Sequence, residues 1–233
     1  MLEIKNLIKQ FGPKTAVDIP ELKISTGETV GLVGNNGAGK TTLFRLILDL
    51  YQATEGCVLS KGNDVAKTEE WKEYTGAFID NSFLIDFLTP EEYFDFVGNT
   101  RGVSKPDIDE KISMFHKFFN NEILGQQKYI RNFSSGNKQK VGIAGAMFCR
   151  PEIVILDEPF NFLDPSSQIE IKHLLRKFNE EFGTTILISS HNLDHIVDVS
   201  TRIILMENGK IINDINNQNN EASQILNDYF QTK

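Results

Sequence analysis

The sequence predicts an α/β fold with a mostly parallel core sheet, an antiparallel β layer at the N-terminus and an inserted helical segment. The apolar runs Ile153–Leu156 and Thr184–Ser189 are typical of strands buried on both faces, and a helical pattern after Asp164-Pro165 separates them. Alternating apolar and polar residues from Leu2 indicate half-exposed strands at the beginning. With 233 residues, 40% of them hydrophobic and 24% charged, the chain fits one folded domain of ordinary size.

The N-terminal part contains a hairpin followed by a strand, a loop and a helix. Leu2–Lys9 and Lys14–Ile24 alternate in polarity around a Gly-Pro turn, which predicts two antiparallel strands. The apolar run Thr29–Val33 leads into a glycine-rich loop, and a helical pattern covers Gly39 to about Leu50. This order is typical of a strand that delivers a loop to the end of a parallel sheet.

Helical signals dominate the middle of the chain, after weak strands at Cys57–Leu59 and Ala77–Ile79. Thr89-Pro90-Glu91-Glu92 combines an N-cap, a first-turn proline and a glutamate at the third helical position, which predicts a capping box. Several phenylalanines follow at helical spacing, and we interpret them as core contacts rather than a binding platform. They are Phe94, Phe96, Phe115, Phe118 and Phe119.

The C-terminal part predicts a hairpin, a linker and a helix. Arg202–Ile212 reads as two short strands around Asn208-Gly209, a strong hairpin signal. The polar stretch Asn213–Asn220 predicts a surface linker, and Glu221–Phe230 predicts a terminal helix.

The charge balance limits the kinds of partner. Lys and Arg number 24 against 32 Asp and Glu, so the net charge is −8 and the pI is about 5.1. Neutralising phosphates requires an excess of basic residues, and we therefore expect no nucleic-acid partner. Neither a signal peptide nor an apolar run of membrane-spanning length is evident, which predicts a cytoplasmic chain. Cys57 and Cys149 lie far apart and are assigned no chemistry.

Residues Gly34–Thr41 match the pattern GxxxxGK[ST], between a predicted strand and a predicted helix. Glycines let the backbone N–H groups turn toward phosphate oxygens, and the helix adds its positive end. The Lys40 ammonium would reach the β- and γ-phosphates, and the Thr41 hydroxyl would bind Mg²⁺. The contacts to a nucleotide are therefore predicted at Gly34, Asn35, Asn36, Gly37, Ala38, Gly39, Lys40, Thr41 and Thr42.

An acidic pair, Asp157-Glu158, directly follows the strand Ile153–Leu156. Its place at the carboxyl end of a parallel strand puts it at the edge of the sheet where the phosphate loop is expected. Alternation along a strand would point the two carboxylates in different directions. Asp157 then fits the Mg²⁺ shell, and Glu158 fits a general base for the attacking water. A helix cap or turn is the alternative, and the complete phosphate loop favours catalysis.

Three further segments decide between families of phosphate-loop proteins. Phe133–Met147 begins Phe-Ser-Ser-Gly-Asn and continues as a helical run, Asn161–Asp164 follows the Glu-Pro dipeptide, and Ser189–His191 ends the next strand. Together with the phosphate loop they resemble, in order, the signature, D-loop and switch histidine of ATP-binding cassette proteins. Phe11 lies where that family stacks an aromatic ring on adenine. The resemblance covers nearly the whole chain and implies a phosphate-loop NTPase fold.

The resemblance implies a head-to-tail dimer, expected to pair two identical chains around two ATP molecules. Each ATP would lie between the phosphate loop of one chain and the signature of the other, and Asp164 would belong to the D-loop. Lys40, Glu158 and His191 would be the catalytic residues, with His191 contacting the γ-phosphate. The signature residues that would contact the partner's ATP are Ser134, Ser135, Gly136 and Asn137. Without the family, Ser-Ser-Gly before a helix reads as an ordinary N-cap.

The chain departs from the family pattern at two places. The family usually has a glutamine that touches Mg²⁺ after the strand entering the helical subdomain, whereas here Asp80-Asn81 follows Ala77–Ile79. We assign Asp80 as the candidate replacement in the metal site. Ser135 and Asn137 also differ from the usual signature, which predicts a changed fit to the γ-phosphate.

The resemblance implies the ATP-binding subunit of a transporter, with ATP and Mg²⁺ as cofactors. The chain would form a single ATPase domain over residues 1–233, with a helical subdomain at 80–150 that docks on a separate membrane permease through Thr75–Gly98. It would lie in the cytoplasm, on the inner face of the membrane, and export is the expected direction. The alternative is a soluble cassette ATPase that acts in translation or repair.

Overall fold

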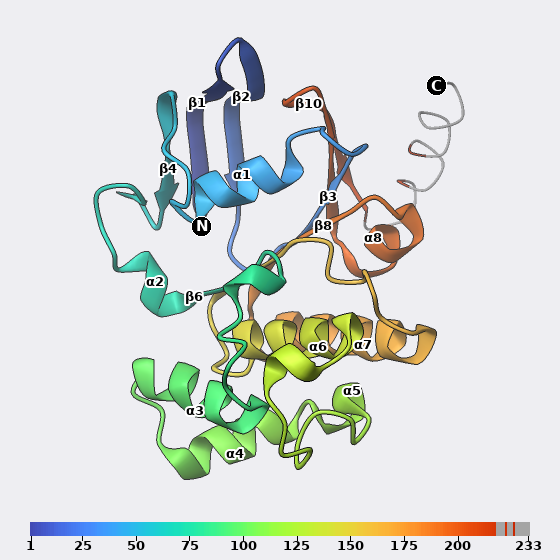
Figure 1. Cartoon of the computed structure of the whole chain (residues 1–233). Helices are drawn as coiled ribbons and strands as arrows, with labels where there is room; N and C mark the ends of the chain where they lie inside the picture. The colour runs from blue at the N-terminus through green and yellow to red at the C-terminus, as the bar shows by residue number, and fades with distance from the viewer. Residues whose placement is uncertain (218–221, 223–225, 227–233) are drawn as a thin grey trace. The chain divides into compact units, whose positions relative to one another are not determined.

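The computed structural model describes residues 1–217 together with Ala222 and Leu226 (Figure 1). The chain divides into two compact units. The first unit is formed by Met1–Lys72 and the residues from Thr185 onward, and the second unit by Glu73–Thr184. The terminal helix predicted over Glu221–Phe230 lies outside the described residues, apart from Ala222 and Leu226.

The first unit begins with an antiparallel sheet of β1 (Leu2–Phe11), β2 (Lys14–Ile24), β4 (Glu55–Ser60) and β5 (Asn63–Asp64). β1 pairs with β2 on one side and with β4 on the other. Leu2, Ile4 and Leu7 of β1 are buried, because one face of the sheet is covered, and the alternation shifts by one residue at Asn6, which has φ of 48°. The predicted hairpin and the N-terminal β layer are therefore confirmed.

The first unit also contains strands of the core sheet: β3 (Thr29–Val33), β8 (Thr185–Ser190), β9 (Arg202–Glu207) and β10 (Lys210–Asn216). β3 lies between β8 and β9 and is parallel to both. Every residue of β3 and β8 is buried, as their continuous apolar character predicts. β9 and β10 form the predicted hairpin, and Asn208 and Gly209 in its turn have φ of 49° and 81°.

Two boundaries in the first unit differ from the prediction. Helix α1 (Lys40–Ile47) ends before Leu50, because the chain enters the left-handed region at Asp49, with φ 50°. Residues 213–216 were expected in a linker, and they instead continue β10. The reason is tertiary: Asp214 on β10 binds the side chain of Arg202 on β9. Helix α8 (Leu193–Val199) also belongs to this unit.

The second unit contains the parallel strands β6 (Thr75–Phe78) and β7 (Ile153–Leu156). Its helices are α3 (Pro90–Thr100), α4 (Lys105–Ser113), α5 (His116–Phe119), α6 (Ser135–Met147) and α7 (Pro165–Phe182), with 3₁₀ turns η1 (Asn81–Phe83) and η2 (Ile130–Asn132). The short α2 (Trp71–Tyr74) spans the boundary between the units. The mostly parallel α/β fold with an N-terminal antiparallel layer is confirmed.

The helices of the second unit enclose a phenylalanine core. Phe94, Phe115, Phe118 and Phe119 are buried, as predicted, and Phe148 and Phe178 join them through ring contacts. Phe96 is 49% exposed, so its assignment to the core is wrong. α3 turns Phe94 inward, and Phe96, two positions on, falls on a different face of the helix.

The capping box that begins α3 is confirmed in both of its hydrogen bonds. The Glu92 N–H donates to the Thr89 hydroxyl at 3.3 Å, and the Glu92 carboxylate accepts the N–H of Thr89 at 2.8 Å. The helical subdomain expected at 80–150 falls within the second unit, whose bounds are wider because they include β6, β7 and α7. That subdomain stays a prediction.

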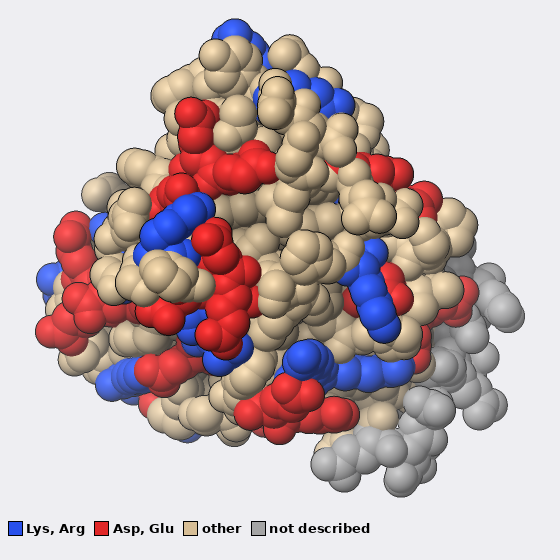
Figure 2. Space-filling view, turned by 90° about the horizontal axis from the view of Figure 1, so that it is seen from below, with Lys and Arg blue, Asp and Glu red and all other residues tan. Residues whose placement is uncertain are grey.

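The surface charge and the apolar character of the helices are relevant to possible partners. On the face in Figure 2, Lys and Arg are interspersed with Asp and Glu. None of the helices in the described part of the chain combines the length and the apolar character needed to cross a membrane.

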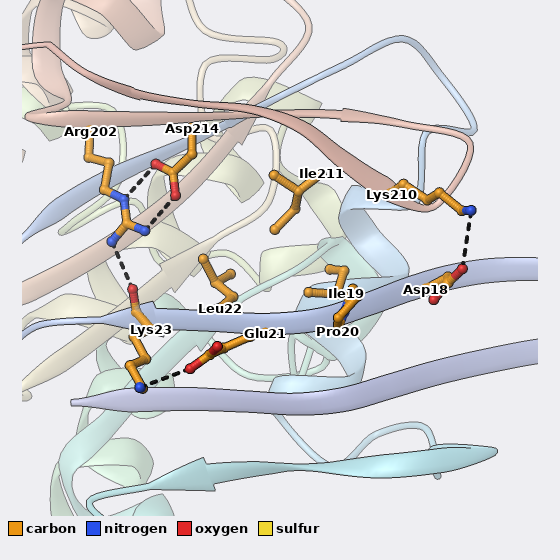
Figure 3. Close-up of a pocket in the computed structure, with 10 residues that line it drawn as sticks. All are labelled: Asp18, Ile19, Pro20, Glu21, Leu22, Lys23, Arg202, Lys210, Ile211 and Asp214. Carbon is orange, nitrogen blue, oxygen red and sulfur yellow. Dashed lines mark hydrogen bonds and ion pairs between the residues drawn. The ribbon is translucent and has the colours of Figure 1, made fainter.

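Arg202 joins several elements of the first unit beside a pocket of about 580 Å³ (Figure 3). Its guanidinium donates to both carboxylate oxygens of Asp214, at 2.8 and 2.7 Å, and to the carbonyl of Lys23 at 2.7 Å. It also binds Glu28 at 3.1 Å. The hydrogen bonds to Asp214 raise the pKa of Arg202 above its ordinary value. One cation therefore holds β9, β10, β2 and the turn before β3 together.

Replacing Arg202 with Ala is expected to lower the free energy of unfolding by about 1.5–3 kcal/mol, because charged hydrogen bonds of a half-buried group are lost. Lys23→Ala is the matched control, since its ion pair with Glu21 is exposed and should matter little. Urea denaturation of both variants measures the difference. Equal urea midpoints for the two variants would show that the hydrogen bonds of Arg202 do not stabilise the fold.

Candidate nucleotide site

The phosphate loop of the first unit has a backbone conformation that favours glycine. Gly37 and Gly39 have φ of 85° and 109°, and Gly34 has φ of 158°. A Cβ on Gly34 would lie 2.3 Å from the carbonyl oxygen of Met206, and one on Gly39 would lie 2.5 Å from that of Ala16. The loop is therefore curled tightly against neighbouring backbone, the conformation that points N–H groups inward in anion-binding loops.

Lys40 begins α1 and is 6% exposed. Its Nζ donates to the carbonyl of Gly34 at 2.6 Å, across the loop that it follows. The N-cap of α1 is Gly39, which offers no side-chain cap, and the first turn holds no acidic residue. The positive end of α1 is thus left for an anion from elsewhere.

The remaining loop residues differ in exposure. Asn35, Asn36 and Gly37 are exposed, whereas Ala38 is buried. The Ala38 N–H donates to the carbonyl of Asn35 at 3.0 Å, and the Ala38 carbonyl accepts the N–H of Gly209 at 2.9 Å. Thr41 and Thr42 are half-buried in the first turn of α1. The hairpin turn at Gly209 therefore holds the backbone of the loop at Ala38.

Phe11 ends β1 with 45% of its surface exposed. Its ring meets that of Tyr51 edge to face, with centroids 5.4 Å apart, and the Lys9 ammonium lies 4.9 Å from its centre. Arg45 of α1 donates to the Tyr51 hydroxyl at 2.7 Å. No sequence motif marks Tyr51, which lies in the loop after α1, and only the fold brings it to Phe11.

His191 directly follows β8 in the first unit and is exposed. Asn192 caps α8 by accepting the N–H of Asp194 at 3.0 Å. His191 thus stands between the end of a buried strand and the beginning of a helix. His195 is half-buried on α8.

In the second unit, Asp157 and Glu158 immediately follow β7. Asp157 is 7% exposed, and its N–H donates to the carbonyl of Phe78 at 3.0 Å. Glu158 is half-buried with φ of 47°, the left-handed region. The prediction relied on strand alternation to separate the two carboxylates, whereas the chain here has left the strand. A backbone turn at Glu158, of the strained kind that clusters at functional sites, sets its direction.

The signature segment begins α6. The Ser134 hydroxyl accepts the N–H of Asn137 at 3.2 Å, so the N-cap expected without the family is present. Ser134 and Ser135 are exposed, and Gly136 and Asn137 are half-buried. The first turn of α6 contains no acidic residue. The backbone N–H of Asn137, one of the residues expected to contact the partner's ATP, is therefore bonded within the chain.

Asp164 and Asp80 both act as helix caps in the second unit. Asp164 caps α7, accepting the N–H of Ser167 at 3.0 Å and its hydroxyl at 2.6 Å. Hydrogen bonds from Ser166 and Ser167 hold the pKa of Asp164 well below its usual value. Asp80 caps η1 by accepting the N–H of Ser82 at 2.7 Å. Both carboxylates are thus oriented by their own loops.

The predicted residues fall into two groups. The first unit carries Phe11, the phosphate loop and His191, and the second unit carries Asp80, the signature Ser134–Asn137 and the acidic residues Asp157, Glu158 and Asp164. The pocket of Figure 3 contains none of them. Its charged side chains pair among themselves, Lys210 with Asp18, Lys23 with Glu21 and Arg202 with Asp214, so it is not a candidate site.

Comparisons with known proteins show the family of the chain. Residues 17–161 match the sequence model of the ABC transporter family. The bacitracin transport ATP-binding protein BcrA of Enterococcus faecalis is 35% identical over 222 residues, covering 93% of this chain and 69% of that protein. The methionine import ATP-binding protein MetN 3 of Oceanobacillus iheyensis is 33% identical over 221 residues, covering 91% of this chain and 64% of that protein.

Solved structures show the same fold. An ATP-binding subunit of an ABC transporter matches with a TM-score of 0.85 at 25% identity, over 97% of this chain and 93% of that one. The dimeric ATP-binding cassette MJ0796 in a post-hydrolysis state with ADP and Pi matches with a TM-score of 0.83 at 24% identity, over 94% and 99%.

The family match and the loop around Lys40 define a phosphate-loop ATPase. The chain belongs to the ABC transporter family, as an ATP-binding subunit that hydrolyses ATP.

Gly34→Ala is expected to abolish nucleotide binding, because the new Cβ would overlap the backbone carbonyl of Met206. Gly37→Ala is the matched control: no atom lies within 4 Å of its Cβ, and only the positive φ costs energy, about 1–2 kcal/mol. Titration with a fluorescent ATP analogue measures both affinities. If the two variants bind equally well, the close approach of the backbone does not matter for this loop.

Proposed function

We propose that this subunit powers a separate membrane permease as half of a head-to-tail dimer that encloses ATP. The observation that supports the proposal is the difference between the N-termini of two helices, α1 and α6, in one chain. α1 follows a complete phosphate loop, whereas α6 begins with exposed serines, lacks acidic residues in its first turn and has no phosphate loop of its own. A second chain that brings its ATP to α6 would supply the missing negative charge.

We propose the contacts to ATP from the motifs of the sequence and their resemblance to the family. Phe11 stacks on adenine, and the amides of the phosphate loop, with Lys40, bind the β- and γ-phosphates. His191 contacts the γ-phosphate, and Glu158 accepts a proton from the attacking water. Ser134, Ser135, Gly136 and Asn137 contact the partner's ATP, with Asp164 in the adjoining D-loop.

The oxygen donors present suit Mg²⁺, a hard ion that prefers hydroxyl and carboxylate ligands. Thr41 in the first turn of α1 and the nearly buried Asp157 are the residues that would hold it. When bound, the ion neutralises charge on the phosphates. Asp80 stays our candidate for the position of the usual glutamine, and its bonds to Ser82 would orient it there.

The permease is proposed to dock on residues 75–98. Three phenylalanines in this range are unusually exposed for their size: Phe83 at 49%, Phe87 at 62% and Phe96 at 49%. Apolar surface of this kind is typical of protein contacts. The chain would thereby lie at the inner face of the membrane. Relatives include a bacitracin transport protein and methionine and sulfate/thiosulfate importers, and we propose export on the sequence around Thr89–Glu92.

Lys40→Ala is expected to weaken ATP binding by about 10- to 100-fold, because a charge-assisted contact worth about 1.5–3 kcal/mol is lost. Lys67→Ala is the control, since this lysine is 79% exposed and its ammonium pairs with Asp64. Calorimetric titration with ATP measures both. An unchanged affinity for Lys40→Ala would remove the phosphate loop from the proposal.

Glu158→Gln is expected to slow hydrolysis by about 10²–10⁴-fold, because the amide cannot accept the proton. ATP should then hold two chains together, and light scattering at saturating ATP should report a dimer. Glu181→Gln, in the last turn of α7, is the control and should hydrolyse ATP at the parent rate. Parent-rate hydrolysis or only monomers for Glu158→Gln would contradict the proposal.

A further inference from the structure

Two neighbouring polar side chains of α6 are almost completely buried. Gln139 is 4% exposed and Lys140 is 2% exposed, on a helix whose following residues, 141–147, are buried as well. Burying an amide or an ammonium is costly unless each finds a partner. An apolar residue at either position would pack without that cost. The partners of Gln139 and Lys140 therefore indicate what these two side chains do.

Both side chains reach the segment between β7 and α7. The Gln139 amide donates to the backbone carbonyl of Glu158 at 3.2 Å. The Lys140 ammonium lies 3.8 Å from Oδ2 of Asp164 and 3.3 Å from Oε2 of Glu122. Because successive residues on a helix point about 100° apart, one helix reaches both ends of the 158–164 segment.

The same helix also touches the middle of this segment. A Cβ on Gly136 would lie 2.6 Å from the carbonyl oxygen of Phe162, so the two backbones are in close contact. Glu158 and Phe162 have left-handed φ angles of 47° and 63°, which are unfavourable for residues with side chains. Such a conformation persists only where surrounding contacts hold it, and α6 supplies contacts at Glu158, Phe162 and Asp164.

We infer that Gln139 and Lys140 are positioning residues that join the signature helix to the Glu158–Asp164 segment, so that both move as one body. The inference rests on the proposed function, in which the beginning of α6 meets the partner's ATP and Glu158 acts on the chain's own. Gln139 binds the backbone from which the general base projects, and Lys140 pairs with the D-loop aspartate Asp164. ATP arriving at the signature of one chain would thereby affect the general base of the same chain.

The test compares Lys140→Met, Lys140→Arg and the parent in full-length protein. Met keeps an unbranched apolar stem without the charge, and Arg keeps the charge. Lys140→Met is expected to lower kcat by about 10- to 100-fold, as misplacement of catalytic groups does. The KM for ATP and the calorimetric affinity should not change, because the phosphate loop lies in the other unit. Lys140→Arg should restore kcat, and the exposed Lys117→Met serves as control.

Gln139→Met provides a second measurement, and it replaces the first if Lys140→Met does not fold. It removes the bond to the Glu158 carbonyl, and we expect the same fall in kcat at unchanged ATP affinity. A folded Lys140→Met or Gln139→Met with parent kcat overturns the inference. So does a joint fall of kcat, ATP affinity and melting temperature that Lys140→Arg does not restore, which indicates a purely structural role.

The Glu158→Gln variant distinguishes a failure of this inference from a failure of the proposed function. If it loses hydrolysis while Lys140→Met keeps the parent rate, the positioning role fails and the proposed function stands. If Glu158→Gln hydrolyses at the parent rate, the general base is misassigned and the inference fails with it.

Discussion

The phosphate loop depends on close contact between backbones. Gly34 and Gly39 lie against the carbonyls of Met206 and Ala16, with no room for a side chain. These carbonyls come from β9 and β2, two strands far apart in the chain. The loop that would receive triphosphate is therefore shaped by the hairpin turn at Gly209 and by the β layer as much as by its own sequence.

Each unit contains a helix whose N-terminus favours an anion. α1 and α6 both begin without acidic residues, and the amides of their first turns favour an anion. The difference is that α6 carries its own cap in Ser134, whereas α1 has Gly39 and no side-chain cap. The Ser134 hydroxyl already accepts one N–H of α6, whereas no side chain caps the first turn of α1.

Local patterns predicted much of the fold because they depend on neighbours in the chain. The capping box at Thr89 and the hairpin at Asn208-Gly209 formed as expected, since each is decided within a few residues. Patterns that depend on distant residues were predicted less well. Residues 213–216 read as a linker but form a strand, because Asp214 binds Arg202 across the hairpin. Phe96 read as core and lies at the surface.

The sequence by itself determined the residue types of the candidate site: the glycines and Lys40 of the loop, the acidic pair at 157–158 and the serines before α6. These follow from chemistry, since phosphate binding requires bare amides and a cation, and each motif is contiguous. Only the tertiary structure decided how these residues are held. No contiguous sequence pattern predicts three of these features. They are the left-handed backbone at Glu158, the contact of Tyr51 with Phe11, and the buried pair Gln139 and Lys140. They arise because packing brings distant segments together and leaves polar groups without water, which must then bind one another.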